Sequence, residues 1–89
     1  MTRRYLVIYE NGPTNLSGFA PDVPGCACTG HCLEEMRAKL REALEFHLEG
    51  LALDGQLLPQ PTTHMAEVPE DGFAEWLTVS LPIAEAISA

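Results

Sequence analysis

Four side chains that could bind a soft metal ion or carry out thiol chemistry lie within one short stretch: Cys26, Cys28, His31 and Cys32. Thiolates and imidazoles are preferred ligands of zinc and iron sites, so this cluster could form a metal or redox module. Structural zinc sites usually pair ligands from two separated segments, however, and the remaining chain offers only His47 and His64. We therefore expect no metal and no cofactor, and we keep the metal or redox module as an alternative.

Single residues of the cluster also have plain structural explanations. Cys32 stands where a helix should begin, and a helix N-terminus can activate a thiolate. We favour a role as the N-cap, with Glu35 completing a capping box three residues later. His47 falls on an apolar helical stripe, where a buried core histidine is expected rather than a base or a ligand.

The chain carries no recognised catalytic motif and is strongly acidic. It contains no G-x-S-x-G, phosphate-binding glycine loop or H-E-x-x-H sequence, so we expect no enzyme activity. Five Lys and Arg against thirteen Asp and Glu give a net charge of −8, which argues against direct nucleic-acid binding. The apolar runs are too short for a membrane span or a secretion signal, and three clustered cysteines suit a reducing cytoplasm.

The elements that must position these residues follow from the hydropathy pattern. We predict strands over residues 4–10, 15–20, 26–29 and 75–81, and a helix over 32–53. A stiff loop with two prolines precedes the third strand, and an irregular segment over 56–72 holds a possible edge strand at 64–68. The fold class is therefore α+β: one domain over residues 1–89, in which a small antiparallel sheet (β-β-β-α-β) carries one long helix on one face.

The predicted helix has two unlike faces. Its apolar stripe contains Leu33, Met36, Leu40, Ala43, Leu44, His47 and Leu51. Its acidic face contains Glu34, Glu35, Glu42, Glu45 and Glu49. One helix covers only one face of a sheet. Because the other face would carry either Tyr5 and Tyr9 or Phe19 and Trp76, we expect a homo-oligomer.

Several segments together resemble the HicB-type antitoxin domain. They are Tyr5-Leu6-Val7-Ile8, the P-D-x-P-G-C loop at 21–26, the T-G-x-x-x-E-E sequence at 29–35, the helix segment 43–51 and the L-D-G-Q-L-L-P-Q-P segment at 53–61. The resemblance covers roughly residues 4–61. It implies a fold similar to a partial ribonuclease H core, and a binding module that neutralises a small, basic, mRNA-cleaving toxin of the HicA type.

The resemblance also sets expectations about partners and contacts. Complete HicB antitoxins commonly add a C-terminal DNA-binding segment, and since the sequence ends at Ala89 we expect a stand-alone form without one. The alternative is an orphan homo-oligomeric binding protein with no toxin partner. The toxin contacts expected first are the loop Asp22, Val23, Pro24 and Gly25 and the helix residues Glu42, Glu45 and Glu49. The same residues could instead be a fold-determining turn and a solvated face.

Overall fold

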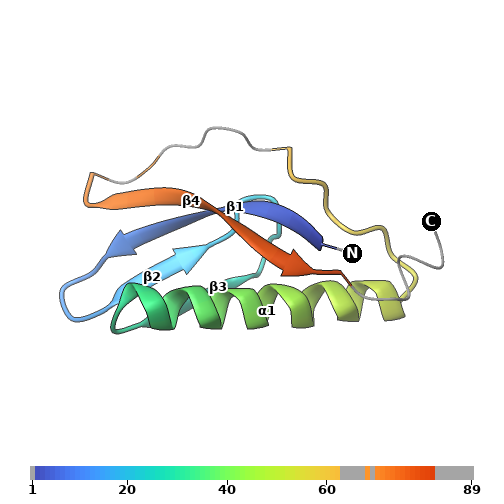
Figure 1. Ribbon diagram of the computed structural model, residues 1–89, viewed down its shortest axis with the longest axis horizontal. Coiled ribbons are helices and arrows are strands. Elements are labelled where there is room, and N and C mark those ends of the chain that lie inside the picture. The colour runs from blue at the N-terminus through green and yellow to red at the C-terminus, as the bar shows by residue number, and fades with distance from the viewer. Residues whose placement is uncertain (1, 63–67, 69, 82–89) are drawn as a thin grey trace.

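The computed structural model describes residues 2–62, 68 and 70–81. Its elements follow the order β1 (Thr2–Asn11), β2 (Leu16–Phe19), β3 (Ala27–Gly30), α1 (Leu33–Leu53) and β4 (Gly72–Ser80). The four strands form one antiparallel sheet in the order β3-β2-β1-β4, and α1 lies along one face of it (Figure 1). The expected α+β class and β-β-β-α-β order are confirmed.

The strand boundaries differ modestly from the predicted ones. β1 extends beyond the predicted range at both ends, and β4 begins three residues earlier than predicted and ends at Ser80, because the two strands pair from Thr2↔Ser80 to Glu10↔Gly72. Cys26 lies just before β3 instead of within it. The possible edge strand at 64–68 lies outside the described residues, apart from Val68, which belongs to no strand.

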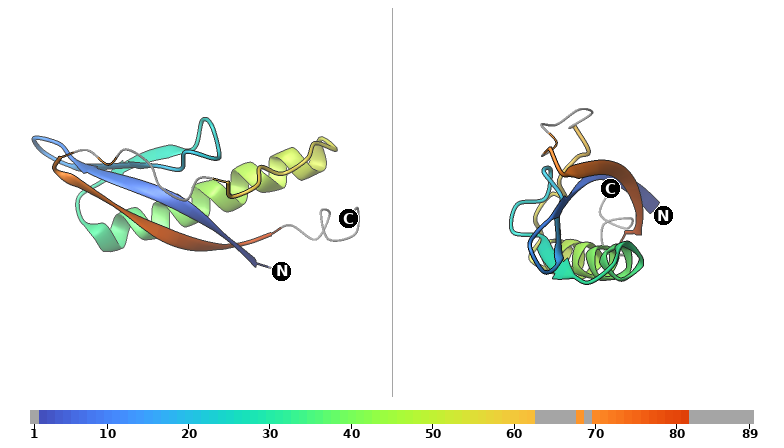
Figure 2. Two further views of the ribbon diagram at one scale, coloured as in Figure 1. Left: turned by 90° about the horizontal axis from the view of Figure 1, so that it is seen from above. Right: turned by 90° about the vertical axis from the view of Figure 1, so that its left-hand side faces the viewer.

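The register decides which aromatic residues face the helix. Tyr5, Val7 and Tyr9 are fully buried and belong to the core under α1, together with Leu77 and Val79 of β4. Phe19 and Trp76 pair with Ile8 and Leu6 on the opposite face, and each is 41% exposed. The sheet curves around α1 when viewed along the helix (Figure 2).

The buried side of α1 is narrower than predicted. Met36, Leu40, Leu44 and Leu48 are all completely buried, at a spacing of four residues. Leu48 was not in the predicted stripe, and His47, expected in the core, is only half-buried because it lies at the flank of this row. Gly18 of β2 lets the helix pack closely on the sheet: a Cβ there would lie 2.9 Å from Met36 Cε and 3.0 Å from Leu40 Cδ1, and these side chains would have to shift.

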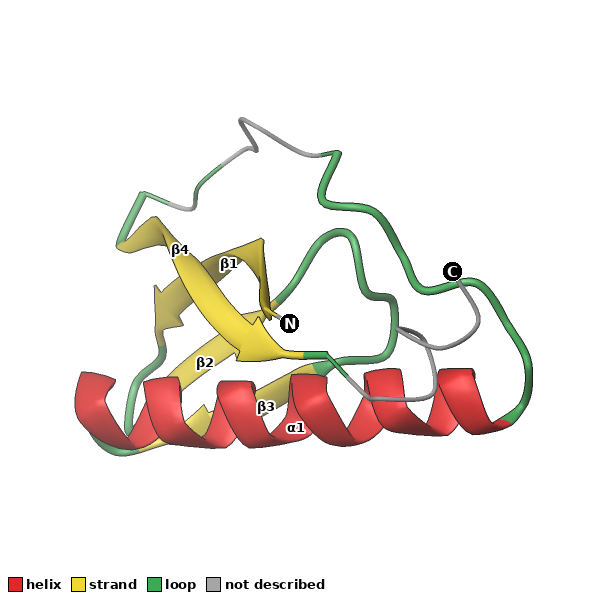
Figure 3. Ribbon diagram, turned by 45° about the vertical axis from the view of Figure 1, so that its right-hand side comes forward, coloured by secondary structure: helices red, strands yellow, loops and turns green. Residues whose placement is uncertain are grey.

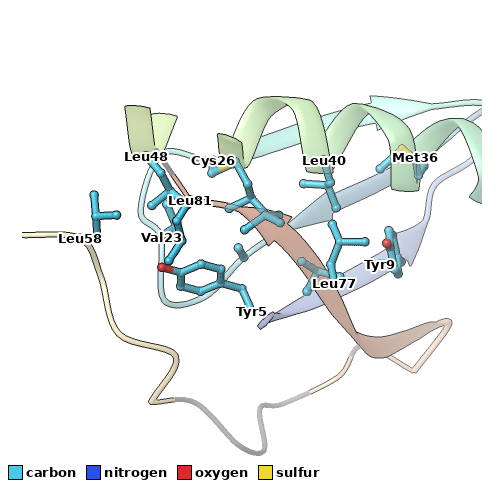
Figure 4. Close-up of a cluster of buried hydrophobic side chains, with 14 residues drawn as sticks. Tyr5, Tyr9, Val23, Cys26, Met36, Leu40, Leu48, Leu58, Leu77 and Leu81 are labelled. Carbon is cyan, nitrogen blue, oxygen red and sulfur yellow. The ribbon is translucent and has the colours of Figure 1, made fainter. Parts of the chain in front are cut away.

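The segment after the helix is held against the end of the core. Leu58 is buried beside Val23 and Leu48 (Figure 4). Tyr5 donates a hydrogen bond of 2.5 Å to the Pro59 carbonyl, and Arg3 donates a longer one to the same oxygen. Among the described residues, no helix has both the length and the apolar composition that a membrane span requires.

Candidate functional site

The loop between β2 and β3 is fixed by its own backbone and by one buried side chain. Ala20 N–H donates to the Cys26 carbonyl, and Cys26 N–H donates to the Val23 carbonyl at 3.2 Å. Val23 is 0% exposed and packs in the core. Asp22 accepts a hydrogen bond from the Thr62 hydroxyl at 3.2 Å. The prolines and Val23 thus hold the loop in one shape.

Only part of this loop is available to a partner. Pro24 and Gly25 are exposed at its tip, where Gly25 adopts a φ of +86° that favours glycine. The loop rises away from the helix (Figure 3). Of the predicted contact residues in this loop, Val23 contributes to the fold and the tip residues contribute to the surface.

The acidic residues of α1 also divide into two kinds. Glu45 is half-buried, and its carboxylate accepts a hydrogen bond of 2.7 Å from the Ser80 backbone N–H. Glu42 and Glu49 are exposed on the outer side of the helix. Glu45 therefore fastens β4 to α1, whereas Glu42 and Glu49 point into solvent.

No basic residue compensates the acidic side chains in the second half of α1. All five Lys and Arg of the chain lie at or before Arg41, and the last turn of α1 contains none. A helix C-terminus carries partial negative charge and prefers cations. Glu49 and the C-cap residue Asp54 lie at the end that disfavours them. These two carboxylates therefore gain no stabilisation from the helix dipole.

The loop tip and the outer face of α1 are separate surfaces. Glu42 and Glu49 lie on the side of α1 opposite the buried row, while the loop stands on the sheet side (Figure 3). The sequence named the loop and the acidic helix face as the contact regions expected first. In the structure the loop tip and the outer face of α1 lie on different sides of the molecule, so a partner that contacts both must extend over two sides.

A charged network that the sequence analysis missed connects three elements. Arg37 of α1 binds Glu75 of β4 with two hydrogen bonds of 2.8 Å, and the buried Tyr9 hydroxyl of β1 donates to the same carboxylate at 2.8 Å. Arg37 holds the pKa of Glu75 below its usual range. Burial, followed by the bond to Glu75, raises the pKa of Tyr9. Residues far apart in sequence offer no local pattern by which to pair them.

The cysteine cluster is dispersed by the fold. Cys26 is buried, Cys28 is half-buried on the helix side of β3, and Cys32 and His31 are exposed. Burial raises the pKa of both the Cys26 and the Cys28 thiols, which keeps them protonated and poorly nucleophilic. Within the described ranges, no three His, Cys, Asp or Glu side chains are placed to hold a metal ion.

The expected capping box forms only in part. Cys32 occupies the N-cap position with an extended backbone, but its thiol makes no capping hydrogen bond. Glu35 reaches back to the backbone N–H of His31 at 3.2 Å, one residue earlier than a capping box requires. A thiol is a weak acceptor, which explains why Cys32 does not replace Ser or Thr here.

Comparisons with known proteins agree with the fold. Residues 5–87 match the family described as the HicB-like antitoxin of bacterial toxin–antitoxin systems. The chain is similar to a HicA3 and HicB3 toxin–antitoxin complex, with a TM-score of 0.61 and 21% identity over 90% of this chain and 99% of the matched chain. It is also similar to the N-terminal domain of the Burkholderia pseudomallei antitoxin HicB, with a TM-score of 0.67 and 23% identity over 90% and 99% of the two chains.

Two further matches involve longer proteins. The B. pseudomallei antitoxin HicB matches at a TM-score of 0.65 and 21% identity, over 93% of this chain and 66% of that one. An uncharacterised 14.9 kDa protein from the rep–hol intergenic region of Haemophilus phage HP1 (strain HP1c1) is 45% identical over 40 residues. That match spans 45% of this chain and only 30% of the phage protein.

Proposed function

The chain belongs to the HicB-like antitoxin family of bacterial toxin–antitoxin systems, and from this premise we propose that it neutralises a basic, mRNA-cleaving toxin of the HicA type. It acts by binding the toxin and not by catalysis. A structurally similar protein is part of a HicA3 and HicB3 toxin–antitoxin complex, which supports a partner of this kind. Because the toxin's substrate is mRNA, the complex would form in the cytoplasm.

The observation that carries this proposal is the uncompensated acidic half of α1. Glu49 is exposed and has no basic residue after Arg41 in the chain to balance it, and Glu42 is exposed on the same side of the helix, with Lys39 one turn before it. A surface that binds RNA must be positive, and an acidic surface is attracted to it and can cover it. The primary contact in our proposal is therefore the outer face of α1, with Glu42 and Glu49 as its charges.

Pro24 and Gly25 at the loop tip form the secondary contact in this proposal. They are exposed, and the loop is held rigid by Val23 and its backbone hydrogen bonds, so little order is lost on binding. Asp22 and Glu45 are assigned to the fold first, because each already has a hydrogen-bond partner within the chain.

Charge reversal tests the proposed contact. The double variant Glu42→Lys with Glu49→Lys should bind a HicA-type toxin at least about tenfold more weakly at low salt, since it removes the attraction and adds repulsion. The affinity should also become less dependent on salt. Titration calorimetry at several salt concentrations measures both effects.

A matched control keeps the charge change and moves its position. The end of β1 and the start of β4 lie at the opposite end of the molecule from the C-terminal end of α1 (Figure 1). The exposed Glu10 pairs with Gly72 there, and the exposed Glu70 lies two residues before β4 begins. The double variant Glu10→Lys with Glu70→Lys should retain near-native affinity. Equal losses in the two double variants would mean that net charge alone attracts the toxin, and the assignment to α1 would be wrong.

A further inference from the structure

The outward side of α1 carries two exposed apolar side chains beside its two exposed carboxylates. Phe46 and Leu53 are 78% and 74% exposed, and their spacing of seven residues puts them on the same side of the helix. Glu42 and Glu49 lie on this side too, four residues before and three residues after Phe46. This side faces away from the sheet, which lies on the other side of α1 (Figure 2). We call these four residues, together with Gly50, the outer stripe.

Gly50 leaves a gap in the outer stripe between Phe46 and Leu53. A glycine inside a helix lowers the stability of that helix relative to alanine. This fold does not require one here, since a Cβ at Gly50 would meet no atom within 4 Å and the positive φ after the helix belongs to Gly55. Without a Cβ, another backbone can approach α1 closely at this point. The stripe therefore has the shape that admits a crossing helix.

The carboxylates of the outer stripe favour a basic occupant. Lys39, one turn before Glu42, is engaged elsewhere. Its ammonium binds the Glu35 carboxylate at 3.0 Å and the Thr29 carbonyl at 2.9 Å. No Lys or Arg follows Arg41 in the sequence. A second copy of the stripe would bring carboxylates against carboxylates, and an anionic membrane would repel them, so the complementary surface is a basic protein element.

We propose that the outer stripe receives a basic amphipathic α-helix of the partner protein, which crosses α1 at Gly50. The apolar side of that helix packs between Phe46 and Leu53, and its Lys or Arg side chains reach Glu42 and Glu49. Apolar burial at the centre supplies affinity, and the ion pairs at the rim fix the orientation. The inference rests on the proposed function, in which the toxin contacts the outer face of α1, and adds the kind of element that the toxin presents.

The geometry of α1 favours a helix over an extended strand as the occupant. A strand adds to a protein by pairing with unpaired backbone groups at a sheet edge, and the backbone groups within a helix are already paired. Phe46 and Leu53 stand about 10.5 Å apart along the axis of α1, which is close to the diameter of a helix, about 10 Å. One helix can therefore lie between the two side chains and rest on the glycine.

Gly50→Leu tests the shape of the stripe without changing its charge. The new side chain fills the gap, so the affinity for the HicA-type toxin encoded beside this chain's gene should fall about tenfold or more. The matched control is Ala38→Leu, because Ala38 is exposed on α1 twelve residues before Gly50. That variant should bind within about twofold of the wild type. Titration calorimetry measures the affinities, and circular dichroism checks that both variants are folded.

Photo-cross-linking identifies the element that occupies the stripe. The aromatic cross-linker benzoylphenylalanine replaces Phe46 in one variant and Leu53 in another, and each is illuminated in complex with the toxin. Mass spectrometry should find both attachment sites on one basic helix of the toxin, within about two turns of each other. Attachment to a strand or to two separate toxin segments would overturn the proposal. So would attachment to a second copy of this chain.

The outcomes separate this inference from the proposed function. If charge reversal at Glu42 and Glu49 weakens toxin binding but Gly50→Leu does not, the toxin contacts the outer face of α1 without a crossing helix. The inference is then wrong while the proposed function stands. If the wild-type chain does not bind the toxin at all, both are wrong.

Discussion

Glu75 is the residue at which the charged and aromatic parts of this fold meet. Its carboxylate accepts two hydrogen bonds from Arg37 and one from the buried Tyr9, so one side chain ties α1 and β1 to β4. A carboxylate with several charge-assisted partners stays ionised to lower pH than a free one. Glu75 should therefore make the stability of the fold sensitive to acid.

The acid sensitivity gives the first prediction. Because Arg37 lowers the pKa of Glu75 from its ordinary 4.5, the unfolded state binds the proton first as the pH falls. The stabilisation is complete above the unfolded pKa and is lost as the pH falls through the folded pKa. Urea denaturation from pH 7 to pH 3 should show a steeper loss for the wild type than for Glu75→Gln. Glu10→Gln, at the exposed end of β1, should keep the steep slope; a shallow slope there would contradict the assignment.

Removing the Tyr9 hydroxyl gives a second prediction at this scale. Tyr9→Phe keeps the ring, which packs 5.0 Å from the Phe73 ring, and removes only the bond to Glu75. A hydrogen bond to a charged acceptor contributes about 1.5–3 kcal/mol, so the free energy of unfolding should fall by that amount. Chemical denaturation measures the loss. An unchanged stability would show that water or Arg37 fully replaces the hydroxyl.

At the scale of elements, α1 does more than cover the sheet. Arg41 and Glu45 bind the outward backbone groups of Thr78 and Ser80, which fastens the last strand along the helix. Glu45 and Glu49 are four residues apart and look equivalent in the sequence. Only the structure shows that the Glu45 carboxylate holds β4, whereas the Glu49 carboxylate is exposed to solvent.

That difference gives a third prediction. Glu45→Ala should lower the free energy of unfolding by about 0.5–1.5 kcal/mol, because the Ser80 N–H loses its acceptor. Glu49→Ala should change it by less than about 0.5 kcal/mol, as expected for an exposed surface site. Thermal or urea denaturation of the two variants side by side decides the matter. Equal losses would mean that Glu45 does not hold β4.

The loop between β2 and β3 gives a fourth prediction. Val23 is fully buried beside Leu48 and Leu58, so Val23→Ala should cost about 2 kcal/mol of stability from lost burial and the cavity that remains. Gly25→Ala should also be unfavourable, because only glycine adopts a φ of +86° without strain. Chemical denaturation checks both variants. A Val23→Ala variant as stable as the wild type would place this side chain outside the core.

The sequence predicted the helix and the strands, but it did not predict the strand register or the hydrogen bonds between distant elements. Alternation in residues 4–10 and four-residue spacing in the helix are local patterns, so the strand order and the helix follow from the sequence. The placement of Tyr5 and Tyr9 under the helix depends on register, which a two-sided apolar strand leaves open. The hydrogen bonds from Arg37 to Glu75 and from Tyr5 to Pro59 join residues far apart in the chain, so no local spacing pattern predicts them.

The candidate site was predictable as a set of residues but not as a surface. Sequence reasoning named the loop at 22–25 and three glutamates of the helix, and it missed the exposed Phe46 between them. The sequence did hold a signal for it, because Phe46 is an apolar residue that falls outside the apolar stripe of the helix.

At the scale of the whole molecule, charge is distributed unevenly. All five basic residues lie in β1 and the first half of α1, and each has a partner within the fold. The second half of α1 is purely acidic among its charged residues. This polarity gives the protein one end that can be attracted to a basic surface without disturbing the contacts that hold the fold.

RNA cleavage measured against the concentration of this chain tests whether it silences a HicA-type toxin by binding it. A purified toxin encoded beside this chain's gene is titrated with the wild type and with the double variant Glu42→Lys with Glu49→Lys. Cleavage should fall to background at a fixed molar ratio with the wild type and require a clear excess of the variant. Cleavage that continues unchanged with the wild-type chain in excess would contradict the claim.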